Sequence, residues 1–245
     1  SHSGLCNRLR LLTSYRNMSQ AEGKDIEFHW VNCVQCWEKY SELFHPIGGV
    51  DFIYKKHLKN RRKSRPANSV VTMNLIKGRN EETCNKNRVL PLSLKEYQKY
   101  LLDIVPLEQI GLEVLKIRSQ LNGDYNACHI RRTDIGTVQK KYSIQPPSDE
   151  SFFEFIESSD KRVFLATDNL NTQKLFKGRF GDKVLTYSKI SGRGNGDGSK
   201  RWPHRMTTIQ SAVIDMFSCI HANSFRGTSG SSFTEFIKDY RQGIC

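Results

Sequence analysis

Apolar residues in the second half of the chain follow two patterns in turn, short runs typical of strands and spaced positions typical of helices. The runs predict strands at residues 126–131, 162–166, 183–187 and 224–227, and the spaced positions predict helices at 151–157, 171–180, 207–220 and 231–240. Strands that alternate with helices pair in parallel within a doubly wound α/β sheet. Ligands of such sheets bind at the carboxyl ends of the strands, so we expect a functional site there.

The first half of the chain gives a sparser pattern. A turn at Gly4 leads into a helix up to residue 20, and later segments predict a strand at 26–30 and helices at 37–44, 94–103 and 107–121. A strand normally precedes such a turn, so we expect the first domain to be truncated at its start. The break at Asn122-Gly123-Asp124 predicts two domains, at residues 1–122 and 123–245.

The composition is typical of a soluble globular protein. The chain has 245 residues with 37% hydrophobic content, and it shows neither a run of 18 apolar residues nor a signal-peptide pattern. Its net charge of +13 favours anionic partners. Charge alone does not show whether the partner is a nucleic acid, an anionic surface or a sugar nucleotide.

The seven cysteines form no regular disulfide framework, which favours a reducing, cytoplasmic location. A secretory-pathway lumen stays open if another segment precedes the chain. Cys33 and Cys36 form a C-x-x-C pair, but no second pair and no histidines at ligand spacing accompany it. We therefore expect two half-buried thiols and no metal site.

Basic residues are concentrated at 55–65, a segment with two interpretations. It is either a solvated loop or a patch that binds phosphate or acidic groups. No aromatic residues interleave its basic core, which argues against binding of single-stranded nucleic acid.

The end of the first predicted strand in the second half carries His129-Ile130-Arg131-Arg132-Thr133-Asp134. Alternation along a strand sends Arg131 and Arg132 to different sides and places His129 on the side of Arg131. One arginine can therefore bind a diphosphate while the other pairs with a carboxylate such as Asp134. A plain ion pair with Asp134 is the alternative.

Two further strand ends carry polar groups. An apolar strand ends at Thr167-Asp168-Asn169, where a carboxylate can accept two N–H donors from a guanine edge or, alternatively, cap the helix from Leu170 onward. The segment 226–233 is rich in small and hydroxyl-bearing residues and runs from a strand into a helix. Its hydroxyl groups and the N–H groups of the helix start form either an anion-binding site or a simple capped turn. It lacks the Gly-Lys-Ser/Thr ending of a P-loop, which argues against ATP hydrolysis.

Taken together, the motifs resemble those of the α1,6- and protein O-fucosyltransferase superfamily. The resemblance rests on His-Ile-Arg-Arg-Thr-Asp at 129–134, Leu-Ala-Thr-Asp at 165–168, Ser-Gly-Ser-Ser-Phe-Thr at 229–234, and a Gly-Leu-Cys-Asn-Arg-Leu turn at 4–9. It implies a GT-B architecture of two Rossmann-like domains facing a central cleft, with the acceptor on the first domain and the GDP-sugar on the second. It also implies an inverting, metal-independent transfer from GDP-β-L-fucose to a glycan or glycoprotein hydroxyl, with no cofactor.

The resemblance further implies roles for individual residues. The donor site would comprise His129, Arg131, Arg132, Asp168, Asn169, Ser229, Gly230, Ser231, Ser232 and Phe233, with Arg8 from the other domain. Within it, Arg131 would hold the β-phosphate and Asp168 would read guanine. Asn7 would reach the cleft and join Arg131 and Asp134 as a catalytic candidate.

One departure from the superfamily concerns the general base. In the core α1,6 enzymes an acidic residue follows the Arg-Arg-Thr-Asp stretch, whereas here Ile135–Gln139 contains no acid. Asp134 is the nearest carboxylate, and a substrate-assisted or base-free route is the alternative. The α1,6 linkage and the N-glycan acceptor are therefore not carried over to this chain.

Other function classes remain as alternatives to a fucosyltransferase. The same fold could use another nucleotide sugar, or the chain could be an inactive sugar-binding relative, since the base is missing. The charge also fits a basic nucleic-acid-binding protein, although no RRM, KH or zinc-finger signature supports that class.

Overall fold

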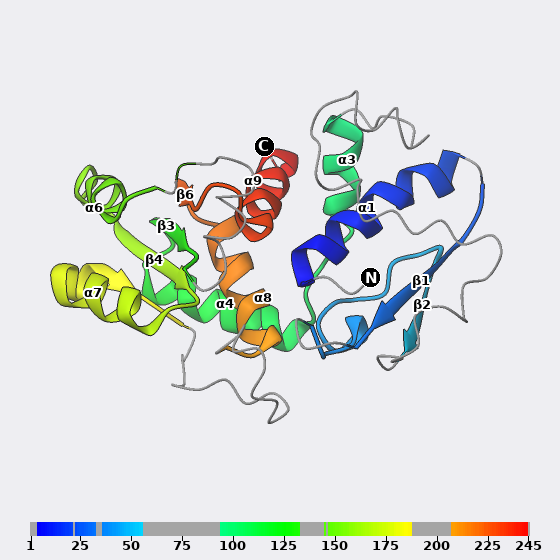
Figure 1. The fold of residues 1–245 in the computed structure, drawn as a ribbon, viewed down its shortest axis with the longest axis horizontal. Helices are drawn as coiled ribbons and strands as arrows, with labels where there is room; N and C mark the ends of the chain where they lie inside the picture. Colours follow the sequence, from blue (N-terminus) through cyan, green and yellow to red (C-terminus); the bar gives the residue numbers. More distant parts are fainter. Residues whose placement is uncertain are drawn as a thin grey trace. The chain divides into compact units, whose positions relative to one another are not determined.

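The computed structural model describes residues 4–21, 23–32, 36–55, 94–132, 145, 147–187 and 207–244. The chain divides into two compact units, residues 1–105 with 242–245, and residues 106–241 (Figure 1). The division precedes helix α4 (Glu108–Gln120), whereas the sequence analysis placed the boundary after it. Helix α4 joins the second unit because its buried face, Ile110, Val114 and Ile117, packs in that unit beside α8 (Ile209–Ile220).

The first unit combines helix α1 (Leu5–Ala21), helix α3 (Leu94–Leu101) and the parallel strands β1 (Ile26–Val31) and β2 (Val50–Lys55). The sequence analysis predicted α1, α3 and β1 but missed β2. Where it predicted a helix at 37–44, the structure has only the 3-10 turn η1 (Tyr40–Glu42).

Aromatic packing explains why that segment is not a longer helix. Tyr40 stacks on Phe52 of β2 at 4.0 Å between ring centroids and meets Trp30 of β1 edge-on at 5.6 Å. These contacts fix the segment against the two strands, so tertiary packing overrides the local helical spacing. Residues 56–65 of the basic run and Cys33 lie outside the described residues. Cys36, which was expected to be half-buried, is fully buried.

The second unit contains a parallel sheet in the order β5-β4-β3-β6. Its strands are β3 (Tyr125–Ile130), β4 (Arg162–Thr167), β5 (Val184–Leu185) and β6 (Phe225–Gly227). Helices α6 (Asp149–Glu157), α7 (Leu170–Phe180), α8 and α9 (Ser232–Ile244) alternate with them. This unit confirms the predicted α/β class with parallel pairing, and most boundaries differ from the predicted ones by one or two residues.

Strand alternation separates the two faces of this sheet. Cys128, Ile130, Val163 and Leu165 pack with phenylalanines of α6 and α7 in one buried cluster. The intervening residues of β3 and β4 face the other side, where α8 packs (Figure 1). No helix within the described ranges is both long and apolar enough to cross a membrane.

Candidate functional site

A crevice opens at the carboxyl ends of β3 and β4, on the α8 side of the sheet. We call it the strand-end crevice, and it is lined by His129, Arg131, Ala166, Thr167, Asp168, Thr207, Ala212, Asp215 and Phe233. Ala166 and Thr167 pair with His129 and Ile130 in the β3–β4 ladder, so the two strand ends meet side by side. Four predicted donor-site residues, namely His129, Arg131, Asp168 and Phe233, therefore come together within one unit.

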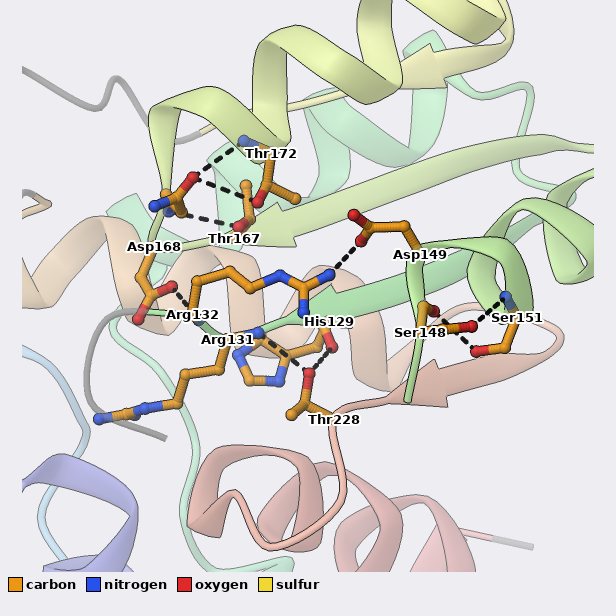
Figure 2. A network of polar contacts seen from close by, with 11 residues as sticks. His129, Arg131, Arg132, Ser148, Asp149, Ser151, Thr167, Asp168, Thr172 and Thr228 are labelled. Atoms are coloured by element: carbon orange, nitrogen blue, oxygen red, sulfur yellow. Dashed lines mark hydrogen bonds and ion pairs between the residues drawn. The ribbon is translucent and has the colours of Figure 1, made fainter. Parts of the chain in front are cut away.

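The two adjacent arginines separate as strand alternation predicts. Figure 2 shows Arg132 extending toward Asp149 at the start of α6, with which it forms an ion pair, while Arg131 extends the other way. Arg131 lines the strand-end crevice together with His129, on the face opposite the α6 cluster. The sequence analysis missed Asp149 as a partner of Arg132, and Asp134, the partner it named, lies outside the described residues.

Asp168 and Asn169 have different tasks. Asn169 is the N-cap of α7, because its side-chain oxygen accepts a hydrogen bond from the backbone N–H of Thr172 at 2.9 Å. Asp168 instead accepts a hydrogen bond from the backbone N–H of Arg132 at 2.9 Å, which ties the ends of β3 and β4 together. Asp168 thus lines the crevice rather than capping the helix, and a nucleotide-binding role for Asn169 stays a prediction.

His129 is a buried, neutral imidazole. Its Nδ1 lies 2.8 Å from the hydroxyl oxygen of Thr234, and its ring packs against Phe233 at 4.5 Å between centroids. Burial lowers the pKa of His129 to about 3, the positive charge of Arg131 acts in the same direction, and Asp168 offsets part of the effect. The ring therefore offers neutral hydrogen bonding at physiological pH and does not add to the charge of Arg131.

The low pKa of His129 predicts an acid-sensitive fold. Below pH 6.5, the pKa of a histidine in the unfolded chain, the unfolded protein binds a proton at His129 that the native protein does not. The free energy of unfolding therefore decreases as the pH is lowered from about 6.5 to about 3. From pH 7.5 to pH 5 this single group should remove about 2 kcal/mol from the free energy of unfolding. Urea titrations at both pH values should show that loss in the parent but not in His129→Asn. Equal losses in the two proteins would contradict the assignment.

The turn between β6 and α9 is tied to the same strand end. The Thr228 N–H donates to the carbonyl of His129 at 3.0 Å. The Thr228 hydroxyl donates to the same carbonyl at 3.2 Å and accepts from the Arg131 N–H at 3.0 Å (Figure 2). Gly230 has φ = 77°, a conformation suited to glycine. Ser231 is buried, with 2% of the residue exposed, and its hydroxyl has no hydrogen-bond partner within the described structure.

A helix start that follows such a turn leaves N–H groups without helical partners, which suits an anion. The buried Ser231 hydroxyl adds an unsatisfied polar group at the same place, where a ligand oxygen would stabilise it. Ser229 is exposed, whereas Ser232 begins α9. The geometry is consistent with the predicted cradle, and the individual contacts of Ser229, Gly230 and Ser232 stay predictions.

Asp215 is the main site residue that the sequence analysis missed. It is 6% exposed and lines the crevice from α8, together with Ala212. A signal was present in the sequence, because Asp215 is the only charged residue in the mainly apolar segment Ile209–Ile220. Such a buried carboxylate in an apolar helix marks a functional candidate.

The two site residues predicted from the first motif lie in the first unit. Asn7 is half-buried on α1. Arg8 is fully buried, with its guanidinium carbon 4.9 Å from the centroid of the Trp30 ring. Packing inside the first unit thus accounts for the burial of Arg8 over Trp30, and donor contacts of Asn7 and Arg8 stay predictions.

In the described part of the chain, no three His, Cys, Asp or Glu side chains gather as a metal site.

Solved structures of fucosyltransferases share this fold over nearly the whole chain. A NodZ α-1,6-fucosyltransferase soaked with GDP-fucose is 16% identical, with a TM-score of 0.59 over 98% of this chain and 90% of its own. The fucosyltransferase NodZ from Bradyrhizobium is 16% identical, with a TM-score of 0.60 over 97% and 90%. NodZ co-crystallized with GDP is 15% identical, with a TM-score of 0.59 over 97% and 89%.

No protein-family model and no curated protein sequence matches the chain. At 15–16% identity the likeness to the NodZ structures is one of fold. It confirms the GT-B-like α/β architecture that the sequence predicted.

Proposed function

We propose that this protein is a glycosyltransferase that binds GDP-fucose in the strand-end crevice and transfers the fucose to a hydroxyl acceptor. The observation that carries the proposal is the grouping of one arginine and two carboxylates, Arg131, Asp168 and Asp215, around a single crevice at a parallel sheet edge. The shared fold supports it, since relatives in structure were crystallised with GDP and soaked with GDP-fucose.

The diphosphate would occupy the side of the crevice formed by Arg131 and the start of α9. A guanidinium can bind two phosphate oxygens at once, and N–H groups at a helix start add further donors. Thr228 holds the Arg131 backbone and the turn together, so both donors share one rigid support. The buried Ser231 hydroxyl would find its partner in a phosphate oxygen.

The guanine base would lie against the two carboxylates. Guanine presents two adjacent N–H donors on its Watson–Crick edge, N1–H and the 2-amino group, whereas adenine has an acceptor at N1 and no amino group at C2. A carboxylate accepts such a pair of donors well. Asp168 lines the crevice and is anchored by the hydrogen bond that it accepts from the Arg132 N–H. Asp215, buried at the wall of the same crevice, supplies a second acceptor.

The chemistry follows as an inverting displacement. The acceptor oxygen bonds to the anomeric carbon of fucose while the bond from that carbon to the β-phosphate oxygen breaks, and GDP departs with the bonding electrons. Negative charge grows on the leaving phosphate, and a preorganised cation at Arg131 would stabilise it by about 3–4 kcal/mol. The acceptor proton passes to Asp134 or, on a substrate-assisted route, to a phosphate oxygen. We propose a glycan or protein hydroxyl as the acceptor.

A nucleotide panel tests this function through the melting temperature. At a hundredfold excess over Kd, GDP and GDP-fucose should each stabilise the protein by about 2.7 kcal/mol, which corresponds to a rise of roughly 5–10 °C. UDP and ADP should shift the melting temperature far less, because they lack the guanine donors. Equal shifts with UDP would contradict the guanine assignment, and binding of random oligonucleotides without any GDP response would favour a nucleic-acid-binding protein instead.

A further inference from the structure

Thr234 contacts His129 from behind, outside the set of residues that lines the strand-end crevice. Its hydroxyl oxygen is 2.8 Å from Nδ1 of His129, and the residue is fully buried. Gly227 pairs with His129 in the β3–β6 ladder, and a Cβ at Gly227 would lie 2.6 Å from the same hydroxyl oxygen. The Thr234 side chain therefore fits here because β6 carries a glycine, and the strand confines the hydroxyl beside the imidazole.

The direction of this hydrogen bond follows from the acceptors that the Thr234 proton can reach. Threonine hydroxyls within helices can donate to the carbonyl four residues earlier, as Thr13 does to Leu9 at 2.9 Å. Thr234 is the third residue of α9, so the residue four places earlier is Gly230, in the turn before the helix. Among the described residues, the hydroxyl of Thr234 has one hydrogen-bond partner, Nδ1 of His129. A buried donor without an acceptor is costly, so the hydroxyl donates and Nδ1 accepts.

The hydrogen bond to Nδ1 decides where the His129 ring carries its own proton. A neutral imidazole has one proton, on one of its two nitrogens, and burial keeps His129 neutral by lowering its pKa to about 3. Because Nδ1 accepts the Thr234 proton, the ring proton lies on Nε2. Nε2 makes no hydrogen bond within the described part of the chain, and His129 lines the strand-end crevice. A ligand in the crevice therefore meets an N–H donor on this ring.

We propose that Thr234 is a positioning residue that fixes the Nε2–H tautomer of His129 and so presents an N–H donor to an oxygen of the bound guanosine nucleotide. The inference rests on the proposed function for its ligand, whereas the tautomer is a property of the free protein. The guanine carbonyl and the diphosphate both offer acceptor oxygens to such a donor. The opposite tautomer would present a lone pair, which repels these oxygens.

The ¹⁵N NMR signals of the histidine side chains test the tautomer in the free protein, with His129→Asn to assign the signals of His129. In the parent, Nδ1 should show the chemical shift of an unprotonated nitrogen and Nε2 that of a protonated one. Thr234→Ser keeps the hydroxyl and should preserve this pattern. Thr234→Val keeps the shape but removes the donor, so the two shifts should move toward each other. A protonated Nδ1 in the parent, or unchanged shifts in Thr234→Val, would overturn the inference.

Calorimetric titration with GDP tests what the tautomer does for binding. Thr234→Val should weaken GDP binding about three- to tenfold, the value of one hydrogen bond, and Thr234→Ser should bind like the parent. Thr13→Val removes another buried helical hydroxyl, in the first unit, and is the matched control that should keep the parent affinity. Guanosine identifies the acceptor, since a loss shared by GDP and guanosine assigns the guanine carbonyl and a loss confined to GDP assigns the diphosphate.

Two results would contradict the role in binding. Unchanged GDP affinity in Thr234→Val would show that the N–H donor does not reach the nucleotide, and an equal loss in Thr234→Ser would show that Thr234 acts through packing. A parent that has the expected tautomer but does not bind GDP would instead overturn the proposed function, and the NMR result on Thr234 and His129 would stand.

Discussion

Replacing Arg131 with alanine is expected to lower the rate of fucose transfer by about 100- to 1000-fold. Arg131 is the arginine of the pair that lines the strand-end crevice, whereas Arg132 is held by Asp149 on the other face of the sheet. In the proposed mechanism a guanidinium there would stabilise the charge that develops as GDP leaves, so its removal should lower kcat more than it weakens donor binding. The backbone at this position is fixed by Thr228 whatever the side chain, so the fold should survive.

The measurement is steady-state release of GDP from GDP-fucose, together with circular dichroism to confirm folding. Arg131→Lys keeps a charge but loses the bidentate geometry, and it should fall between the parent and the alanine variant. Arg162→Ala is the matched control, because Arg162 lies at the amino end of β4 and binds the carbonyls of Asp182 and Gln120 far along the strand from the crevice. Equal rates in the parent and Arg131→Ala would remove Arg131 from the mechanism.

Replacing Gly227 with alanine should destabilise the second unit by about 3 kcal/mol and also weaken GDP binding. A Cβ at this position would lie 2.6 Å from the Thr234 hydroxyl oxygen and 3.0 Å from the Phe225 ring, closer than atoms can pack. Thr234 is fully buried and binds His129 Nδ1. The methyl group must therefore displace the helix start or the imidazole, and both belong to the site.

Chemical denaturation with and without GDP measures both effects of Gly227→Ala. Gly178→Ala on α7 is the control, since nothing lies within 4 Å of a Cβ placed there and alanine favours a helix by about 1 kcal/mol. That variant should be as stable as the parent or slightly more stable. A Gly227→Ala protein with unchanged stability would show that β6 and α9 lie farther apart than the structure has them.

The separation of Arg131 from Arg132 was predictable because strand alternation is a local rule. The same rule placed His129 beside Arg131, and parallel pairing brought Asp168 to the same edge. The sequence did not show which residue at 168–169 caps the following helix. Asn169 is the N-cap because it directly precedes the first residue of α7.

The missed features depend on packing between distant segments. Strand β2 is recognisable only through its partner β1 and the aromatic contacts between them, and its last residue, Lys55, had been grouped with the basic run. The domain division depends on what the apolar face of α4 packs against, which periodicity does not specify. Asp215 has a signal in the sequence, since it is a single acid in a mainly apolar helix, but its place beside Asp168 depends on how α8 packs on the sheet.

The structure of the protein with GDP bound is the most direct test of the central claim. The account predicts the diphosphate on the Arg131 guanidinium and the helix start after Ser231, with the guanine edge on the carboxylates of Asp168 and Asp215. A nucleotide bound elsewhere, or one whose phosphates and base leave these groups without a contact, would contradict it.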